Sequence, residues 1–508
     1  MTSWMPLALA ALTGLTAWGV GGYEPWAALA LELGSVFLAG FLFVRTLFRT
    51  SREDRERFLA IQRSQRRGTI EVEIVEPTPT GSPRAPYPDP FFFLGYPFRK
   101  NGIGLLLALA TVWVVLSLVP LPLPVLALLS PRALAIRSEA EGLLGRETSL
   151  APWSLAPFLT FQDLLLWIAF VALFVAAHHA VSTRKGARRL SIGLLLVGVA
   201  SGGYGLAQWL TALGGKETAS LFQASGSFGN RNHYAFFQEM LLLIGLGWLS
   251  MSWLHAQTRS ADRVEAQEKK AKVSMVALGV GLIALSLLFS LSRSGIAFAA
   301  AGAALFLHLD KSKRRAWGSY AAVAAAGVLA AALWIGLDPV VSRFGFVADD
   351  LAGGSGRTTV WRDSLGAVSD FWLTGSGASS FQYVYPMYRS FGGRRFYSWA
   401  HNDYLQVGVE FGIPGLALTA ALGVAIVRRA RRVRRDLLDS GSSLARLHAG
   451  YCAAAFAAAL HSFTDFGLHL PANAALFAIV LAAVTGIIPP ASAKRTEGAK
   501  RVVLRRAA

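Results

Sequence analysis

The sequence predicts an all-α polytopic membrane protein with about twelve transmembrane helices and one large external loop between the ninth and tenth spans. Three observations support this prediction. Hydrophobic residues make up 54% of the chain and charged residues only 16%, whereas a soluble protein of this length is about a quarter charged. The apolar residues form runs long enough to cross a bilayer, which takes roughly 20 residues. Short basic clusters separate these runs.

The length rule places each expected span along the chain. The expected spans are 6–22, 24–46, 103–126, 160–182, 189–211, 233–255, 274–291, 295–309, 317–336, 402–427, 447–463 and 473–489. No Lys or Arg precedes the first span, which argues against a cleaved secretory signal.

The formal net charge of +19 is explained by where the basic residues lie. If both termini are cytoplasmic, all the basic clusters fall in cytoplasmic connections, in agreement with the positive-inside bias. These connections are 47–102, 183–188, 256–273, 310–316, 428–446 and the tail after 490. The external connections at 23, 127–159, 212–232, 292–294, 337–401 and 464–472 have no comparable basic runs. A nucleic-acid-binding protein would need a soluble basic domain, so we expect no nucleic-acid partner.

The spans and connections divide the chain into six regions. These are an N-terminal transmembrane hairpin (1–46), a cytoplasmic segment (47–102), a transmembrane bundle (103–336), the large external loop (337–401), C-terminal transmembrane helices (402–489) and a basic cytoplasmic tail (490–508). The segment 47–102 begins charged and ends Pro-rich, which predicts an amphipathic helix followed by an irregular linker.

The external loop 337–401 mixes Arg with aromatic residues, as in "FQYVYPMYRSFGGRRFYSWAHND". A loop this long is either functional or disordered, and its many aromatic residues argue against disorder. One Arg guanidinium can bind two phosphate oxygens at once. Aromatic rings can stack on the C–H faces of sugars. The alternative is an interfacial belt in which Arg reaches lipid headgroups.

The stretch "SWAHNDYLQVGVEFGIPGLAL" (398–418) puts polar residues on a predicted membrane helix, where each is costly. Asp403, Gln406 and Glu410 share one face of that helix because they lie three and four residues apart. Such a stripe is expected to face the bundle interior or a wet cavity. For Glu410 we favour a structural hydrogen-bond network over direct catalysis. Pro414 is expected to kink the helix.

His401 is expected at the external surface, at or just before the start of the same helix. The positive end of a helix disfavours the imidazolium ion, so the ring can stay neutral and accept a proton. The same helix end attracts anions such as phosphate. A lone His is usually structural, but this one has the position of a base and follows an Arg-rich loop.

These residues resemble a known family. "HNDYLQVGVEFGIPGLAL" is similar to the signature helix of the O-antigen ligase/O-antigen polymerase superfamily of bacterial envelope glycosyltransferases. Other stretches resemble that family in the same order: "SGSFGNRNHYAFF" (225–237), "SLSRSGIAF" (290–298), "GSGRTTVWRDSL" followed by "LTGSGASSF", and "HSFTDFGLHLPANA" (461–474). The resemblance covers about residues 220–490.

The resemblance implies transfer of a glycan from undecaprenyl pyrophosphate to an acceptor hydroxyl, at the periplasmic face of the bacterial inner membrane. His401 would be the general base on that hydroxyl, and the reaction would invert the anomeric carbon. The residues implied to hold the donor pyrophosphate are Arg357, Arg231, Arg293 and, as a spare candidate, Arg362. The supporting residues would be Asn402, Asp403, Glu410 and Asp465. Arg293 could instead extend to lipid headgroups.

The resemblance leaves the acceptor open. The expected activity is an O-antigen ligase, whose acceptor is the lipid A core. A polymerase that uses a second lipid-linked glycan, and a protein O-oligosaccharyltransferase, remain alternatives. A solute transporter would show polar residues in several spans and internal repeats, and the sequence has no clear repeat. A purely structural scaffold would have no use for such a His beside external Arg residues.

We expect neither a metal ion nor another cofactor. The single cysteine, Cys452, excludes a disulfide within the chain and a Cys-based metal site. The first external turn offers only Glu24, and Asp349–Asp350 is interpreted as a solvated turn. Catalysis could then rest on Arg charge alone.

Overall fold

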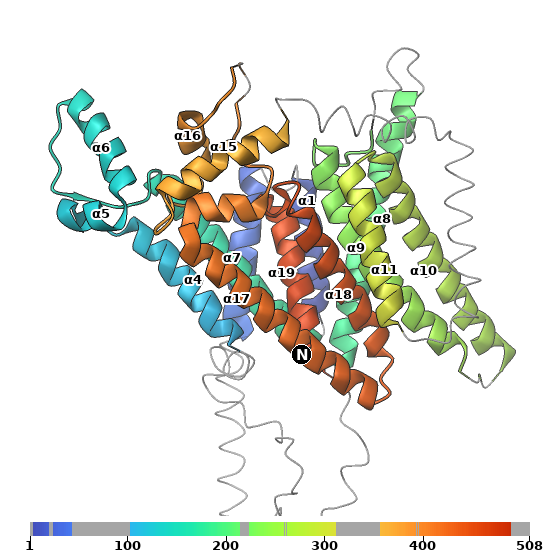
Figure 1. The fold of residues 1–508 in the computed structure, drawn as a ribbon. Helices are drawn as coiled ribbons and strands as arrows, with labels where there is room; N and C mark the ends of the chain where they lie inside the picture. The colour runs from blue at the N-terminus through green and yellow to red at the C-terminus, as the bar shows by residue number, and fades with distance from the viewer. Residues whose placement is uncertain are drawn as a thin grey trace, which may run out of the picture.

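The computed structural model describes residues 4–19, 24–42, 102–213, 223–258, 260, 262–310, 356–392, 394 and 396–488. Its architecture is a bundle of α-helices (Figure 1). The helices of the bundle are α1 (Met5–Trp18), the helix Pro25–Leu42, α4 (Ile103–Leu118), α7 (Pro157–Val181), α8 (Arg184–Leu213), α9 (Arg231–Ala256), α10 (Arg263–Phe289), α11 (Arg293–Leu309), α17 (Asp403–Asp439), α18 (Leu444–His461) and α19 (Pro471–Gly486).

Several of these helices can cross a membrane. In the described part of the chain, six are long and apolar enough: the helix Pro25–Leu42, α7, α8, α9, α10 and α17. Four more, α1, α4, α11 and α19, are apolar but shorter. The predicted all-α membrane fold is therefore confirmed. The count of about twelve and the domain limits stay predictions, because the expected span 317–336, most of the segment 47–102 and the tail 490–508 lie outside the described residues.

The expected span 103–126 was wrong at its end. Helix α4 stops at Leu118, and the chain continues as the short strand β1 (Leu121–Pro122) and the helix α5 (Leu123–Leu129). The sequence "PLPLP" (120–124) explains the stop, because proline lacks the N–H group that an α-helix needs. The connection after it is also more ordered than expected. It contains α6 (Pro131–Leu144) and strand β2 (Leu150–Ala151), which pairs antiparallel with β1.

Helix α9 is largely buried and packs against α8, α10, α11 and α18 (Figure 1). Its approach to α18 is close: a Cβ atom on Gly247 would lie 3.0 Å from the Cα atom of Gly450. Small residues at such a crossing permit dense packing in a membrane. The fully buried Glu239 carboxylate faces His461 across the same contact, with 3.1 Å between Oε2 and Nδ1. A buried charge needs such a partner.

Helix α17 is broken near the residues that were expected to kink it. Gly412 has φ 66° and ψ −165°, a backbone conformation outside the helical region, and Pro414 follows two residues later. Proline cannot donate to the carbonyl four residues before it, so the carbonyl of Glu410 loses its helical partner. The predicted kink is therefore present, with its non-helical residue at Gly412.

The backbone groups freed by this break are bonded by neighbouring segments. The backbone N–H groups of Ser376 and Gly377 donate to the carbonyls of Val409 and Glu410, both at 2.9 Å. The Ile413 N–H donates to the Trp372 carbonyl at 2.7 Å, and the Trp113 indole N–H donates to the Phe411 carbonyl at 3.1 Å. Within a bilayer an unpaired backbone group costs several kcal/mol, so this pairing makes the break tolerable.

The segment that fills the break belongs to the large loop. The described part of that loop contains α15 (Arg357–Asp370), α16 (Phe381–Val384) and the short 3-10 helix η3 (Tyr385–Met387). A second 3-10 helix, η4 (Gly467–His469), lies between α18 and α19. Residues 337–355 lie outside the described residues.

Gly412→Ala is expected to lower the melting temperature of the detergent-solubilised protein. The conformation of Gly412 is essentially restricted to glycine, and forcing another residue into it costs of order 1–3 kcal/mol. An added Cβ atom would also lie 2.6 Å from the Trp372 carbonyl oxygen. Gly423→Ala is the matched control, because it lies on the same helix with no atom within 4 Å of the added Cβ. Equal melting temperatures for the two variants would contradict the account of the break.

Candidate functional site

Three of the predicted arginines are the first residues of their helices. Arg231 begins α9, Arg293 begins α11 and Arg357 begins α15. The end of the bundle that carries them, together with His401, is called the His401 end below. Figure 1 shows α15 lying across this end, where α9 and α11 begin. A helix start has free N–H groups and a partial positive charge, so each arginine adds its charge to an end that already attracts anions.

Side-chain contacts connect these helix starts to one another. The Ser292 hydroxyl, which caps α11, donates to Asn232 Oδ1 at 3.0 Å near the start of α9. One residue further along α9, His233 Nε2 lies 4.0 Å from Asp465 Oδ1. The starts of α9 and α11 are therefore joined, and α9 is joined to the turn that contains Asp465.

Asp465 is the centre of the cluster. Its carboxylate is 2% exposed and lies 3.3 Å from Arg357 Nη2 and 3.4 Å from His401 Nδ1. Arg357 also donates from Nη1 to the carbonyl of Thr464. Burial alone would raise the pKa of the Asp465 carboxyl, but His401 and the charge of Arg357 hold that pKa well below its usual range. Asp465 is therefore a carboxylate at neutral pH.

His401 is held in an unusual backbone conformation. It has φ 53°, in the left-handed region that His tolerates better than most residues. Its carbonyl accepts a hydrogen bond from the Trp361 indole at 3.3 Å. The next residue, Asn402, caps α17 by accepting from the Leu405 N–H at 3.0 Å. The His401 side chain remains 28% exposed, so one side of the ring faces Asp465 while the ring stays accessible.

Aromatic rings surround the cluster. Phe466 meets the rings of His401 and His233 edge-on, with centroids 4.9 and 4.6 Å away, and stacks on Trp399 at 5.8 Å. Tyr397 also meets the His401 ring edge-on, with 6.5 Å between ring centroids. These contacts fix the plane of the His401 ring and exclude water from its Asp465 side.

The stripe Asp403, Gln406 and Glu410 forms hydrogen bonds within the protein. Glu410 Oε1 accepts from the Phe381 N–H at 3.3 Å and from Gln406 Nε2 at 3.0 Å. Asp403 Oδ1 lies 2.8 Å from His469 Nδ1. The stripe thereby fastens α17 to the large loop on one side and to η4 on the other, the arrangement expected of a structural network.

The predicted arginines differ in their surroundings. Arg362 is on another face of α15 from Arg357, and its Nη2 donates to Ser390 Oγ at 3.2 Å, away from Asp465. Arg231 donates to Gln223 Oε1. Arg293 follows Ser292, whose hydroxyl donates to Asn232 at the start of α9, so the backbone at Arg293 is held near the cluster. The structure thus brings Arg231, Arg293, Arg357 and His401 to one end of the bundle and separates Arg362 from Asp465.

Two histidines of this region were not predicted. His233 faces Asp465, and His469 pairs with Asp403. His233 lies in the stretch 225–237 and His469 in the stretch 461–474, both of which resemble the family. Each residue is also close to the start of an expected span, and this position was the available signal. Among the described residues, no group of three His, Cys, Asp or Glu is arranged to hold a metal ion. The pair Asp349–Asp350 lies outside the described residues.

His469→Gln is expected to destabilise the protein by roughly 1.5–3 kcal/mol, the value of a hydrogen bond to a charged group, most strongly at low pH. Burial would lower the pKa of His469, but the bond and charge of Asp403 raise it above its ordinary value. A raised pKa adds stability that is complete below about pH 6.5 and is lost as pH rises through the raised value. Melting temperatures should therefore differ most near pH 6. The exposed His308→Gln is the control, and a pH-independent difference for His469→Gln would contradict the pairing.

Comparison with known families identifies a large part of this region. Residues 278–420 match a family model described as O-antigen ligase. The matched stretch contains every predicted site residue except Arg231 and Asp465. No curated protein matches the chain. The family match and the apolar helices agree with the resemblance noted in the sequence: residues 278–420 of this membrane protein are similar to the O-antigen ligase family.

Proposed function

We propose that this protein is an O-antigen ligase of the bacterial inner membrane, with its active site facing the periplasm. It transfers a glycan from undecaprenyl pyrophosphate to a hydroxyl of the lipid A core. The observation that carries the proposal is the accessible His401 ring held against the buried Asp465 carboxylate, beside helix starts that carry Arg231, Arg293 and Arg357.

His401 is the general base in this proposal. Its Nδ1 faces Asp465, so Nε2 is the nitrogen that accepts the proton from the acceptor hydroxyl. The Asp465 carboxylate fixes the tautomer with hydrogen on Nδ1 and stabilises the imidazolium that forms, the role of the acidic member of a catalytic triad. The hydroxyl oxygen attacks the anomeric carbon opposite the pyrophosphate, so the configuration there inverts.

The donor pyrophosphate binds at the starts of α9, α11 and α15. Each start contributes partial positive charge and one guanidinium group. The leaving group gains negative charge as the glycosidic bond breaks, and donors fixed in advance stabilise that charge without reorganisation. The reaction then needs no metal ion. Arg357 contacts both Asp465 and the donor, which couples the two halves of the site.

The acceptor distinguishes the ligase from its alternatives. A polymerase or a protein O-oligosaccharyltransferase would use the same base and donor site with another hydroxyl. The O-antigen ligase description of the matched family favours the lipid A core. A transporter is disfavoured because the Asp403–Gln406–Glu410 stripe is bonded within the protein.

Purified protein in liposomes should transfer glycan from undecaprenyl pyrophosphate to lipid A core, and EDTA should not stop it. His401→Ala should reduce the rate by about 10²–10⁴-fold, the usual contribution of a general base. Chain lengthening of the donor in tubes without core would identify a polymerase instead. Passage of labelled solute across the bilayer without any glycan product would refute a glycosyltransferase.

Arg357→Gln should raise the KM for the donor and lower kcat, because it removes a charge beside the leaving group and loosens Asp465. A loss of about 10²–10³ in kcat/KM is expected, the usual effect of removing one anion-stabilising donor. Arg146→Gln is the matched control, since Arg146 is exposed on the 127–159 connection outside the site. Similar losses in both variants would mean that surface charge, not the site, governs donor binding.

A further inference from the structure

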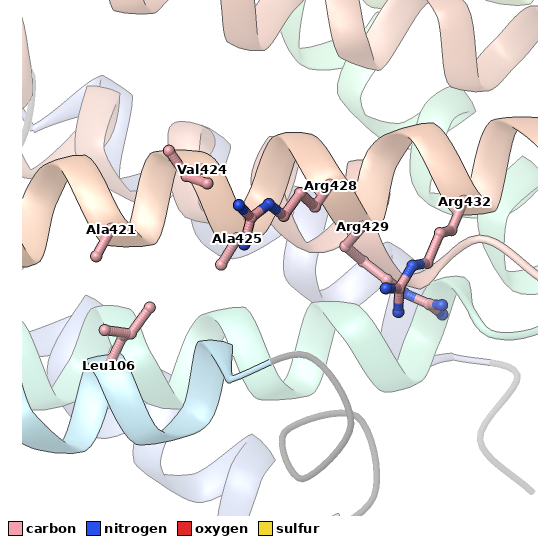
Figure 2. A pocket seen from close by; sticks show the side chains of 7 residues that line it. All are labelled: Leu106, Ala421, Val424, Ala425, Arg428, Arg429 and Arg432. Atoms are coloured by element: carbon pink, nitrogen blue, oxygen red, sulfur yellow. The ribbon is translucent and has the colours of Figure 1, made fainter.

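A cavity of about 430 Å³ lies at the other end of α17, opposite the His401 end. Leu106 of α4 lines it, together with a row of residues on the second part of α17 (Figure 2). A volume of this size is within the range of ligand pockets, roughly 300–1,000 Å³. None of the residues described above for the glycosyltransferase site lines it.

The lining of the cavity changes from apolar to basic along α17. The α17 residues that line it are Ala421, Val424, Ala425, Arg428, Arg429 and Arg432. Their spacing of three and four residues places them on one face of the helix. The apolar residues come first along α17, and the three arginines follow them toward the C-terminal end of the helix (Figure 2).

The three arginines differ in how they are held. Arg429 Nε donates to the Thr485 carbonyl at 3.0 Å, at the end of α19, so its guanidinium is fixed. Arg428 and Arg432 are exposed, and neither forms a hydrogen bond or ion pair with another residue in the part of the chain that the structure describes. No acidic residue is among those lining the cavity.

Three guanidinium groups on one helix face repel one another unless an anion lies between them. Guanidinium forks match phosphate oxygens in geometry and charge. An apolar floor beside a phosphate-binding rim fits a molecule with a phosphate group and a hydrocarbon part. The positive-inside bias explains basic residues in this connection, but it does not require a cavity that joins them to an apolar surface.

We propose that this cavity binds an anionic phospholipid of the cytoplasmic leaflet. The phosphate group lies among Arg428, Arg429 and Arg432, and the first part of an acyl chain lies against Ala421 and Leu106. Basic pockets between membrane helices on the cytoplasmic side are suited to such headgroups. This proposal is independent of the glycosyltransferase reaction.

The test titrates the full-length protein, in nanodiscs of phosphatidylcholine, with phosphatidylglycerol. Native mass spectrometry counts the bound lipid, and the melting temperature reports stabilisation by binding. Arg428→Gln/Arg432→Gln should weaken the specific binding by about tenfold or more, since each basic residue near a membrane surface contributes about 1 kcal/mol. Phosphatidylcholine alone should not be retained.

The matched control is Arg263→Gln/Arg431→Gln. It removes two exposed charges on the same predicted side of the membrane without changing the lining of the cavity. Retention of phosphatidylglycerol by this control, with loss in the cavity variant, supports the site. Equal loss in both variants would reduce the effect to general surface charge and overturn the proposal.

Two further arms keep the test decisive if the arginine variant folds poorly. Ala421→Phe should fill the apolar half of the cavity and weaken phosphatidylglycerol binding with all three arginines present. Inorganic pyrophosphate should stabilise the protein far less than the lipid does. Equal stabilisation by pyrophosphate would assign the cavity to a soluble anion, and unchanged lipid binding in Ala421→Phe would exclude an acyl chain there. Either result overturns the proposal.

Discussion

Asp465 lies between α18 and α19, where this turn meets the large loop, the start of α17 and helix α9. Its burial constrains how these four parts of the chain are arranged. A carboxylate that is 2% exposed must be compensated by nearby positive charge or hydrogen-bond donors. Arg357 at the start of α15 and His401 before α17 supply that compensation, with His233 of α9 beside them. Loss of one partner of a buried ion pair is strongly destabilising. The carboxylate therefore fixes the large loop, α17 and α9 relative to one another, and with them the proposed base and donor site.

The break in α17 meets a second constraint, that of unpaired backbone groups in a membrane. The carbonyls of Val409 and Glu410 lack helical partners, and the turn Ser376–Gly377 supplies them. Gly375 and Gly377 have positive φ in that turn, which brings its N–H groups against α17. The loop is thus part of the helix bundle at this point. His401, eleven residues before Gly412, is carried by a helix segment anchored at both ends.

Sequence reasoning found the features that depend on local pattern. Apolar runs located most of the helices, Pro414 located the break, and the expected start of the polar helix located His401. Arg231, Arg293 and Arg357 came from the family resemblance, and their positions at helix starts were not predicted. It did not find the pairing of His401 with Asp465 or of Asp403 with His469, because those residues are more than 60 positions apart and only packing joins them. The end of α4 was not predicted, because the prolines that end this helix lie within an apolar run.

The two proposed sites lie on opposite sides of the break at Gly412 in α17. The His401 end is fixed by Asp465, the loop turn and η4, whereas the arginine face is fixed by α4 and by the bond from Arg429 to the end of α19. A ligand changes an equilibrium only through its differential affinity for the two states. Lipid bound at the arginines would therefore stabilise the packing of α17 against α4 and α19. The geometry around His401 depends instead on the contacts of its own end, with Asp465, the loop turn and η4.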